Sequence, residues 1–155
     1  MIYGKIGLIL PAIKPAYLFR RSSLLVLLGL IIGFLAPALA NPRMGVYSHI
    51  EGVLNGILLI VLGLIWHRLD LSEKWLNITF WLAVYGTFTN WFGILIASIF
   101  NAGKMLGIRA NGQEGTPFAE GVVIFSLFSL TVAMPSVSLI LLFGLGRTLK
   151  SVNFG

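Results

Sequence analysis

Four long runs of apolar residues dominate the chain, and all but two of its charged residues lie outside them. The runs cover residues 22–40, 47–66, 76–100 and 118–146. A helix needs about 20 apolar residues to cross the hydrocarbon core of a bilayer. The pattern therefore predicts an all-α integral membrane protein, a four-helix bundle that forms one transmembrane domain over residues 22–150.

The two ends of the chain do not fit a spanning helix. Residues 1–21 begin with an apolar and aromatic stretch that contains Pro11 and Pro15. Because proline removes a helical N–H and clashes with the preceding turn, this stretch is predicted to be too short and too broken to span, and to lie at the membrane interface. Residues 151–155 are expected to form a short tail.

The connection over residues 101–117 is rich in glycine and contains the turn pair Asn111-Gly112. Such a sequence indicates an irregular loop. Long loops at the mouth of a scaffold often carry function. We therefore treat this loop as a candidate lid over the membrane face on which it lies.

Basic residues are distributed unequally between the two sides of the predicted bundle. One side has Arg43, Lys104 and Arg109, whereas the side that holds both termini has eight: Lys5, Lys14, Arg20, Arg21, Arg68, Lys74, Arg147 and Lys150. Cytoplasmic loops carry the excess of lysine and arginine. We expect both termini in the cytoplasm and the protein in a bacterial inner membrane.

The composition excludes several classes of protein. Hydrophobic residues make up 57% of the 155 residues and charged residues 10%, whereas soluble domains are about a quarter charged. The net charge of +6 comes from residues that lie singly or in pairs beside the runs, so nucleic-acid binding is not expected. Cysteine is absent, which excludes disulfides and thiol chemistry.

The second run carries its polar residues on one helical face. At about 100° per residue, His49, Glu51 and Asn55 fall with several glycines within one arc, and the opposite arc is wholly aliphatic. One face is therefore expected to meet lipid and the other to meet protein or ligand. Polar side chains are costly within a membrane unless they find partners, so they are the first place to look for function.

Two interpretations are open for this face. Gly52 and Gly56 have the spacing that allows helices to approach closely, or they leave a slot for a flat ligand beside His49. His49 itself is either an interfacial histidine bonded to a neighbouring carbonyl oxygen or a metal ligand. With Glu51 and Asn55 it places three functional side chains within seven residues, which favours a site.

The third run has a stripe of small residues that contains one amide, Asn90, with Tyr85 beside it. At 1.5 Å per residue, Asn55 and Asn90 lie at similar depths, about 12 and 15 Å from the same membrane face. The serines of the fourth run either bond to carbonyl groups of their own helix or line a pocket. Together these residues predict a polar pocket walled by the second, third and fourth helices.

Three functions are compatible with these residues. A small proton-coupled multidrug exporter would use Glu51 as its exchange carboxylate, although a site near one face does not favour alternating access. A cytochrome would need a histidine pair for its haem, and only His49 lies in a span. Haem with one histidine ligand keeps an open position for a substrate, which suits an enzyme.

Two stretches carry a resemblance to a known family: residues 41–56 (NPRMGVYSHIEGVLNG) and residues 80–91 (FWLAVYGTFTNW). Both are similar to the hydroxylaminobenzene mutase family, and the similarity extends over residues 22–146. Enzymes of that family convert hydroxylaminoarenes to aminophenols by moving the hydroxyl group from nitrogen to the ring within one molecule. The resemblance implies an isomerase that acts on a small aromatic substrate.

A more distant resemblance is to styrene oxide isomerase, a four-helix membrane enzyme that forms trimers and holds haem b between subunits. Its second helix has a histidine, an asparagine and a glycine at the spacing of His49, Asn55 and Gly56. The resemblance implies haem b held by His49, with Gly52 and Gly56 beside it, and a homo-oligomer, with a trimer favoured. Glu51 departs from the isomerase, which has no carboxyl group at the matching position.

The resulting hypothesis is a membrane isomerase in which haem acts as a Lewis acid on the hydroxylamino group. Glu51 would favour the positive charge that develops on the substrate, and Asn55 and Asn90 would orient it. Tyr85 would donate a hydrogen bond to the migrating oxygen. Epoxide isomerisation of the styrene oxide isomerase type and export through Glu51 are the alternatives.

Overall fold

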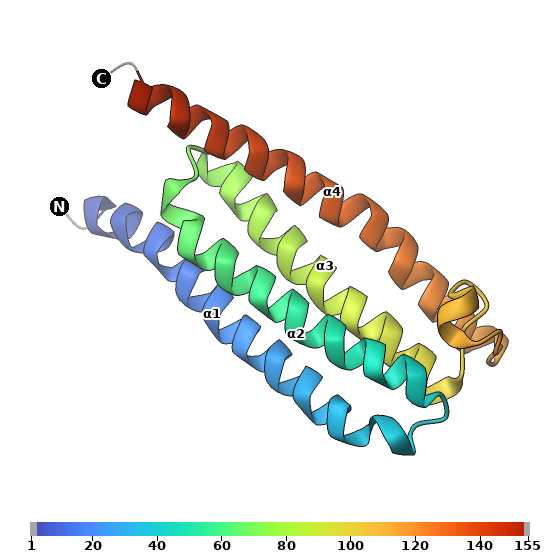
Figure 1. The fold of residues 1–155 in the computed structure, drawn as a ribbon. Helices are drawn as coiled ribbons and strands as arrows, with labels where there is room; N and C mark the ends of the chain where they lie inside the picture. The colour runs from blue at the N-terminus through green and yellow to red at the C-terminus, as the bar shows by residue number, and fades with distance from the viewer. Residues whose placement is uncertain (1–2, 154–155) are drawn as a thin grey trace.

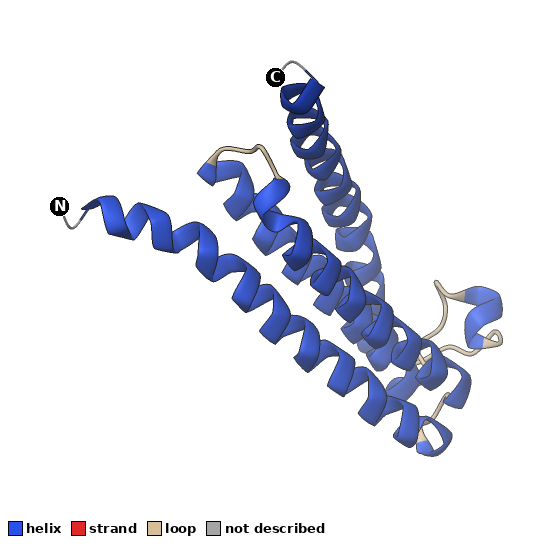
Figure 2. Ribbon diagram, turned by 60° about the vertical axis from the view of Figure 1, so that its left-hand side comes forward, coloured by secondary structure: helices blue, strands red, loops and turns tan. Residues whose placement is uncertain are grey.

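Four long helices pack in chain order. The computed structural model describes the backbone of residues 3–153 and the side chains of residues 14–147. Its helices are α1 (Tyr3–Leu35), α2 (Pro42–Ile65), α3 (Glu73–Phe100) and α4 (Pro117–Asn153). α1 packs on α2, α2 on α3, and α3 on α4 (Figure 1). The described backbone contains no strand (Figure 2), so the all-α prediction is confirmed.

Each helix contains a stretch that is long and apolar enough to cross a membrane. These stretches are Lys14–Ala38, Pro42–Arg68, Glu73–Phe100 and Pro117–Arg147. The first residues of α1 and the last residues of α4 lie at the same end of the bundle as the connection between α2 and α3 (Figure 1). The expected four-helix membrane bundle is therefore confirmed.

The first helix differs from its prediction. Instead of a broken segment followed by a span over residues 22–40, α1 is one helix from Tyr3 to Leu35, and a 3-10 turn at Ala36–Ala38 closes it. Pro11 and Pro15 lie inside it. They are four residues apart and so share one face, and the other backbone hydrogen bonds of those turns continue the helix. The interfacial position of residues 1–21 stays a prediction, and residues 1–2 lie outside the described residues.

The other helices begin earlier or end later than the apolar runs. α4 continues to Asn153, so the first part of the expected tail is helical, and residues 154–155 lie outside the described residues. α2 begins at Pro42 because Asn41 caps it: the Asn41 side-chain oxygen accepts a hydrogen bond from the Met44 N–H at 3.1 Å. Asparagine before proline suits a helix start, since proline at the first position has no N–H to leave unpaired.

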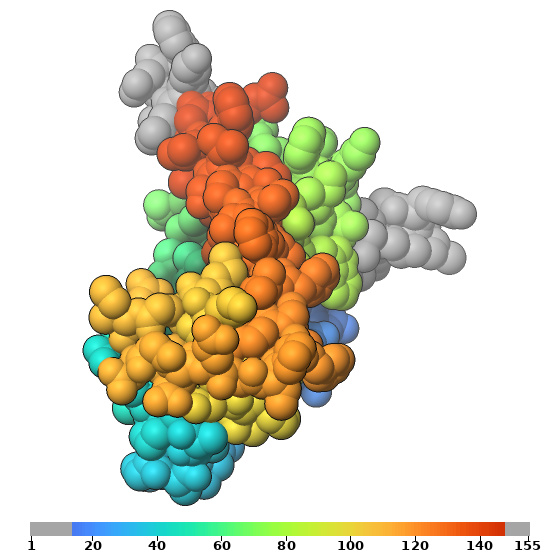
Figure 3. Space-filling view, turned by 90° about the vertical axis from the view of Figure 1, so that its right-hand side faces the viewer, coloured from blue at the N-terminus to red at the C-terminus, as the bar shows by residue number. Residues whose placement is uncertain are grey.

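The connection between α3 and α4 is folded onto the end of the bundle. α3 ends at Asn101, whose left-handed φ of 56° closes the helix, and a 3-10 turn follows at Gly107–Ala110. Ala102 and Ala110 are buried, and the loop lies beside the connection between α1 and α2 (Figure 3). The loop is therefore packed into the structure at several points along its length.

Candidate active site

A carboxylate and two amides meet between α2 and α3. The Glu51 Oε2 atom accepts hydrogen bonds from the Asn90 Nδ2 atom at 2.6 Å and from the Asn55 Nδ2 atom at 3.2 Å. Asn55 lies one turn after Glu51 on α2, and Asn90 reaches across from α3. The matching depths of the two asparagines in the sequence therefore do bring them to one group, the Glu51 carboxylate.

The cluster leaves one carboxylate oxygen without a partner from the described residues. Both amides bond to Oε2, and no described side chain or backbone group donates a hydrogen bond to Oε1. Asn55 is buried, whereas Glu51 and Asn90 are half-buried. The two amides hold the carboxylate in place, and Oε1 remains available to a ligand.

His49 lies on another edge of α2, against α1. Its Nδ1 atom lies 3.0 Å from the Gly29 carbonyl oxygen. A carbonyl oxygen only accepts hydrogen bonds, so Nδ1 carries a proton, and in the neutral imidazole Nε2 then has the lone pair. A Cβ atom on Gly33 would lie 2.8 Å from Nδ1, and the absence of a side chain there makes room for the imidazole ring.

The structure separates His49 from Glu51 within one chain. Two residues of helix turn the side chain by about 200°, and their partners lie on different helices, α1 for His49 and α3 for Glu51. The sequence predicted one pocket walled by α2, α3 and α4 that contained both residues. Helical geometry instead puts them at opposite edges of the buried face of α2.

The glycines of α2 serve helix packing. A Cβ atom on Gly52 would lie 2.6 Å from the Gly29 Cα atom, and one on Gly56 would meet Val26. The space beside both glycines is therefore filled by α1, as in close helix packing. The alternative interpretation, a slot for a flat ligand at Gly52 and Gly56, does not describe these positions in this chain.

Tyr85 and the serines of α4 lie outside the Glu51 cluster. Tyr85 is 42% exposed, and at about 100° per residue it points about 140° away from Asn90 around α3. Ser129 and Ser136 donate hydrogen bonds to the carbonyl groups of Ser126 and Val132 on their own helix. No described side chain of α4 bonds to the Glu51 cluster.

A second buried carboxylate, which the sequence places at the outer end of the fourth helix, was not among the predicted catalytic residues. Glu120, in the first turn of α4, is 7% exposed and accepts hydrogen bonds from the backbone N–H groups of Gly115 at 2.8 Å and Lys104 at 3.2 Å. Glu120 therefore binds the connection between α3 and α4 near its start, at Lys104, and near its end, at Gly115. Its place at a helix N-terminus, where acidic residues are favoured, was the available signal.

Metal ligands are sparse in the described part of the chain. No three side chains among histidine, aspartate and glutamate lie close enough to hold a metal ion there. Haem would need fewer ligands from the protein than a bare metal ion, because the porphyrin itself holds the iron. His49 would hold such a group through Nε2, and its Nδ1–H bond to a carbonyl oxygen is typical of metal-ligating histidines.

Comparison with known proteins shows the family to which the chain belongs. The model of the styrene oxide isomerase family matches residues 16–146. The chain belongs to this family. Its relatives include hydroxylaminobenzene mutase HabA of Ectopseudomonas oleovorans, 48% identical over 132 residues, which are 84% of this chain and 98% of the relative. Hydroxylaminobenzene mutase HabB of the same organism is also 48% identical, over 83% of this chain and 79% of its own length. No solved structure matches the chain.

The family confirms the resemblance that residues 41–56 and 80–91 carry. Both relatives are mutases, a class of isomerase, so an isomerase is supported over an exporter or a cytochrome. His49, Glu51 and Asn90 all lie within the matched range of residues. The helices that carry these three residues therefore lie within the part of the chain that the family model covers.

Proposed function

We propose that this protein is a membrane isomerase that converts hydroxylaminobenzene-type hydroxylaminoarenes to aminophenols. The similarity to two hydroxylaminobenzene mutases over more than four-fifths of the chain supports this substrate class. The observation in the structure that carries the proposal is the Glu51 carboxylate, held by Asn55 and Asn90 inside a membrane-spanning helix.

The reaction needs no oxidant or reductant. The N–O bond of the hydroxylamine breaks, the hydroxyl group forms a bond to a ring carbon, and the proton of that carbon is released as nitrogen gains one. The product is an isomer of the substrate. Positive charge develops on nitrogen and the ring when the N–O bond breaks, and a fixed carboxylate stabilises such charge in a site of low dielectric.

We assign the stabilisation of this positive charge to Glu51. Its Oε1 atom is open to the substrate and accepts the ring proton, whereas Oε2 stays bonded to the two amides. Asn55 and Asn90 then act by orienting the carboxylate, and the structure gives no support for a direct role of Tyr85 in the same chain. Apolar side chains of the bundle would hold the aryl ring.

The distant resemblance implies haem b, for which His49 is the candidate ligand through Nε2. When bound, the haem iron would supply a Lewis acid for the hydroxylamino group. An absorption spectrum of the purified protein with and without dithionite, beside that of His49→Ala, tests this part. We expect a Soret band that the variant loses, and a colourless wild type from haem-replete cells would contradict it.

We also propose that neighbouring subunits complete the site, with a trimer as the implied assembly. The support is the position of His49 and Glu51 at opposite edges of α2, each half-buried. The His49 edge of one subunit facing the Glu51 edge of the next would bring the two groups to one ligand. Mixed oligomers of His49→Ala and Glu51→Gln chains test this, because subunit sharing predicts recovered turnover.

The reaction itself is tested with hydroxylaminobenzene in water labelled with oxygen-18. Transfer within one molecule predicts an aminophenol that carries no label. Label in the product would contradict the intramolecular reaction. The same preparation should be assayed with styrene oxide, because the family model takes its name from that isomerase; faster epoxide isomerisation would favour the second candidate function.

Topology is a further part of the proposal: both termini in the cytoplasm, in a bacterial inner membrane. The basic residues of that side and the shared end of α1 and α4 support it (Figure 1). Because the chain has no cysteine, a single cysteine at position 70 or 111 reports its side by labelling with an impermeant reagent. Labelling of position 70 from outside intact cells would reverse the topology.

A further inference from the structure

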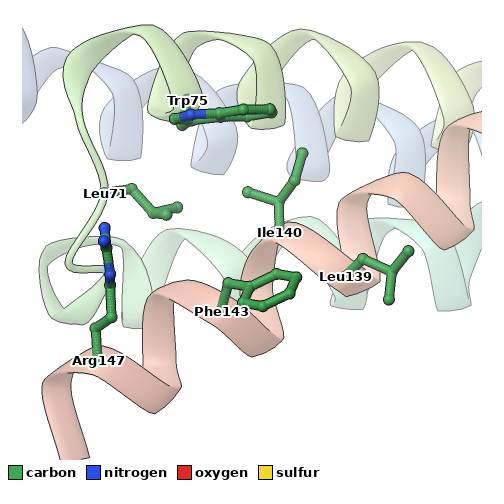
Figure 4. Close-up of a pocket in the computed structure, with 6 residues that line it drawn as sticks. All are labelled: Leu71, Trp75, Leu139, Ile140, Phe143 and Arg147. Carbon is green, nitrogen blue, oxygen red and sulfur yellow. The ribbon is translucent and has the colours of Figure 1, made fainter. Parts of the chain in front are cut away.

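A groove lies at the other end of the bundle from Glu51, between the start of α3 and the last turns of α4. Its cavity volume is about 380 Å³, at the lower end of small-molecule pockets. Figure 4 shows the residues that line it: Leu71, Trp75, Leu139, Ile140, Phe143 and Arg147. Five of these side chains are apolar or aromatic, and the sixth is a cation.

The α4 wall combines an apolar floor with a cation at one end. Leu139, Phe143 and Arg147 are spaced by four residues, so they form one stripe that rises about 6 Å per step. Leu139 is 57% exposed and Phe143 72% exposed. Arg147 lies at one end of the groove, with Phe143 beside it and Leu139 at the far end (Figure 4).

The opposite wall is held in place by the protein itself. Leu71 packs on Gly144 so closely that a Cβ atom there would lie 2.9 Å from the Leu71 Cγ atom. The Asp70 N–H also donates a hydrogen bond to the Gly144 carbonyl oxygen at 3.3 Å. The connection between α2 and α3 is thus anchored to α4, and the groove does not depend on a ligand for its shape.

The charge of the groove is unbalanced. Arg147 forms no hydrogen bond or ion pair with another residue in the described part of the chain. Trp75 is half exposed on the facing wall, and tryptophan is enriched at the headgroup level of membranes. A guanidinium group binds phosphate oxygens through two parallel hydrogen bonds, so an anion with an apolar tail complements both parts of the groove.

We propose that this groove binds one anionic phospholipid. The phosphate group pairs with Arg147, and one acyl chain lies along Phe143, Ile140 and Leu139 beneath the Trp75 indole ring. The volume suits a single chain, whereas a helix of a second copy is about 10 Å across. The proposal is independent of the isomerase function, because the groove shares no residue with the Glu51 cluster.

Native mass spectrometry of delipidated, folded protein tests the proposal with phosphatidylglycerol and phosphatidylcholine as probes. The wild type should bind phosphatidylglycerol about tenfold more tightly than Arg147→Gln, the loss expected for one charge-assisted bond. Lys74→Gln is the matched control, since it removes an exposed cation at the same end that does not line the groove. Arg147→Lys should bind with an affinity between those of the wild type and Arg147→Gln, because it keeps the charge but loses the paired hydrogen bonds.

A second variant, Ile140→Trp, fills the floor and leaves Arg147 unchanged. Loss of phosphatidylglycerol from both Ile140→Trp and Arg147→Gln supports the proposal. Undiminished binding by Ile140→Trp would mean headgroup pairing without the groove and would overturn it, as would equal binding by Arg147→Gln and wild type. Competition by inorganic phosphate, or a change of oligomer mass in step with lipid loss, would assign the groove to a free anion or to a second copy.

Discussion

Two carboxylates in this bundle are bonded in different ways, and the difference underlies the role that we propose for one of them. Glu120 at the end of α4 is 7% exposed, and backbone N–H groups of the adjoining loop bond to it. Glu51 within α2 is half-buried, and side-chain amides from two helices bond to one of its oxygens. The first arrangement closes a loop, whereas the second aims a charged group and keeps one oxygen open.

The comparison shows what sets Glu51, the proposed site residue, apart from Glu120. A buried carboxylate alone does not, since Glu120 is the more buried of the two. What distinguishes Glu51 is that its partners are side chains that neither helix needs for its own backbone, because α2 and α3 are complete without them. Such partners can be removed without unfolding a helix, and the following predictions use this property.

The largest effect is expected for Glu51→Gln. This change keeps the shape of the side chain but removes its charge, so turnover should fall by roughly 10²- to 10³-fold, as for the loss of one electrostatic group in an active site. Thermal unfolding in detergent should change little. Steady-state assays with hydroxylaminobenzene measure the turnover. Unchanged turnover would remove Glu51 from the mechanism.

Glu120→Ala should give the reverse pattern. Two partly buried backbone N–H groups lose a charged acceptor, and a hydrogen bond to a charged group contributes about 1.5–3 kcal/mol. We expect the unfolding free energy to fall by about 2–4 kcal/mol, with turnover retained at temperatures well below the melting point. Hydrogen exchange at Lys104 and Gly115 should rise. A loss of turnover in a protein of normal stability would make Glu120 part of the site and end the contrast.

Asn90→Ala and Asn55→Ala sharpen the comparison within the cluster. If the amides position Glu51, each variant lowers kcat, by roughly tenfold for one hydrogen bond to a charged group, and leaves KM nearly unchanged. The Asn90 variant should be the more severe because its bond is 2.6 Å long against 3.2 Å for Asn55. An increase in KM alone would instead assign the amides to direct substrate binding.

The smallest effect is expected for Ser48→Ala. Ser48 is fully buried beside His49, and its hydroxyl group has no hydrogen-bond partner among the described residues. Removing an unpaired buried polar group is neutral or slightly stabilising, within about 1 kcal/mol, and turnover should not change. A clear loss of activity would show that the hydroxyl group meets a ligand, and the site would then extend to this side of α2.

Several parts of the site could be predicted from the sequence. Asn55 and Asn90 were expected at matching depths, and they meet at Glu51 because a helix rises by a fixed amount per residue. The lipid-facing arc of α2 was also predicted, and Ile50, Leu54 and Val61 are exposed there. The continuous α1 was not, because a proline penalty is local and the surrounding backbone bonds can outweigh it.

The sequence by itself determined the number of membrane helices, the polar face of α2 and the family, because the bilayer demands long apolar helices and makes every polar residue within them conspicuous. Only the tertiary structure decided which neighbour each polar side chain meets. The His49 side chain contacts α1, and the Glu51 side chain contacts α3. Gly29 occupies the space beside Gly52, and Glu120 bonds to the connection between α3 and α4. These outcomes depend on how the helices are arranged around α2, and helical periodicity within one segment carries no information about that arrangement.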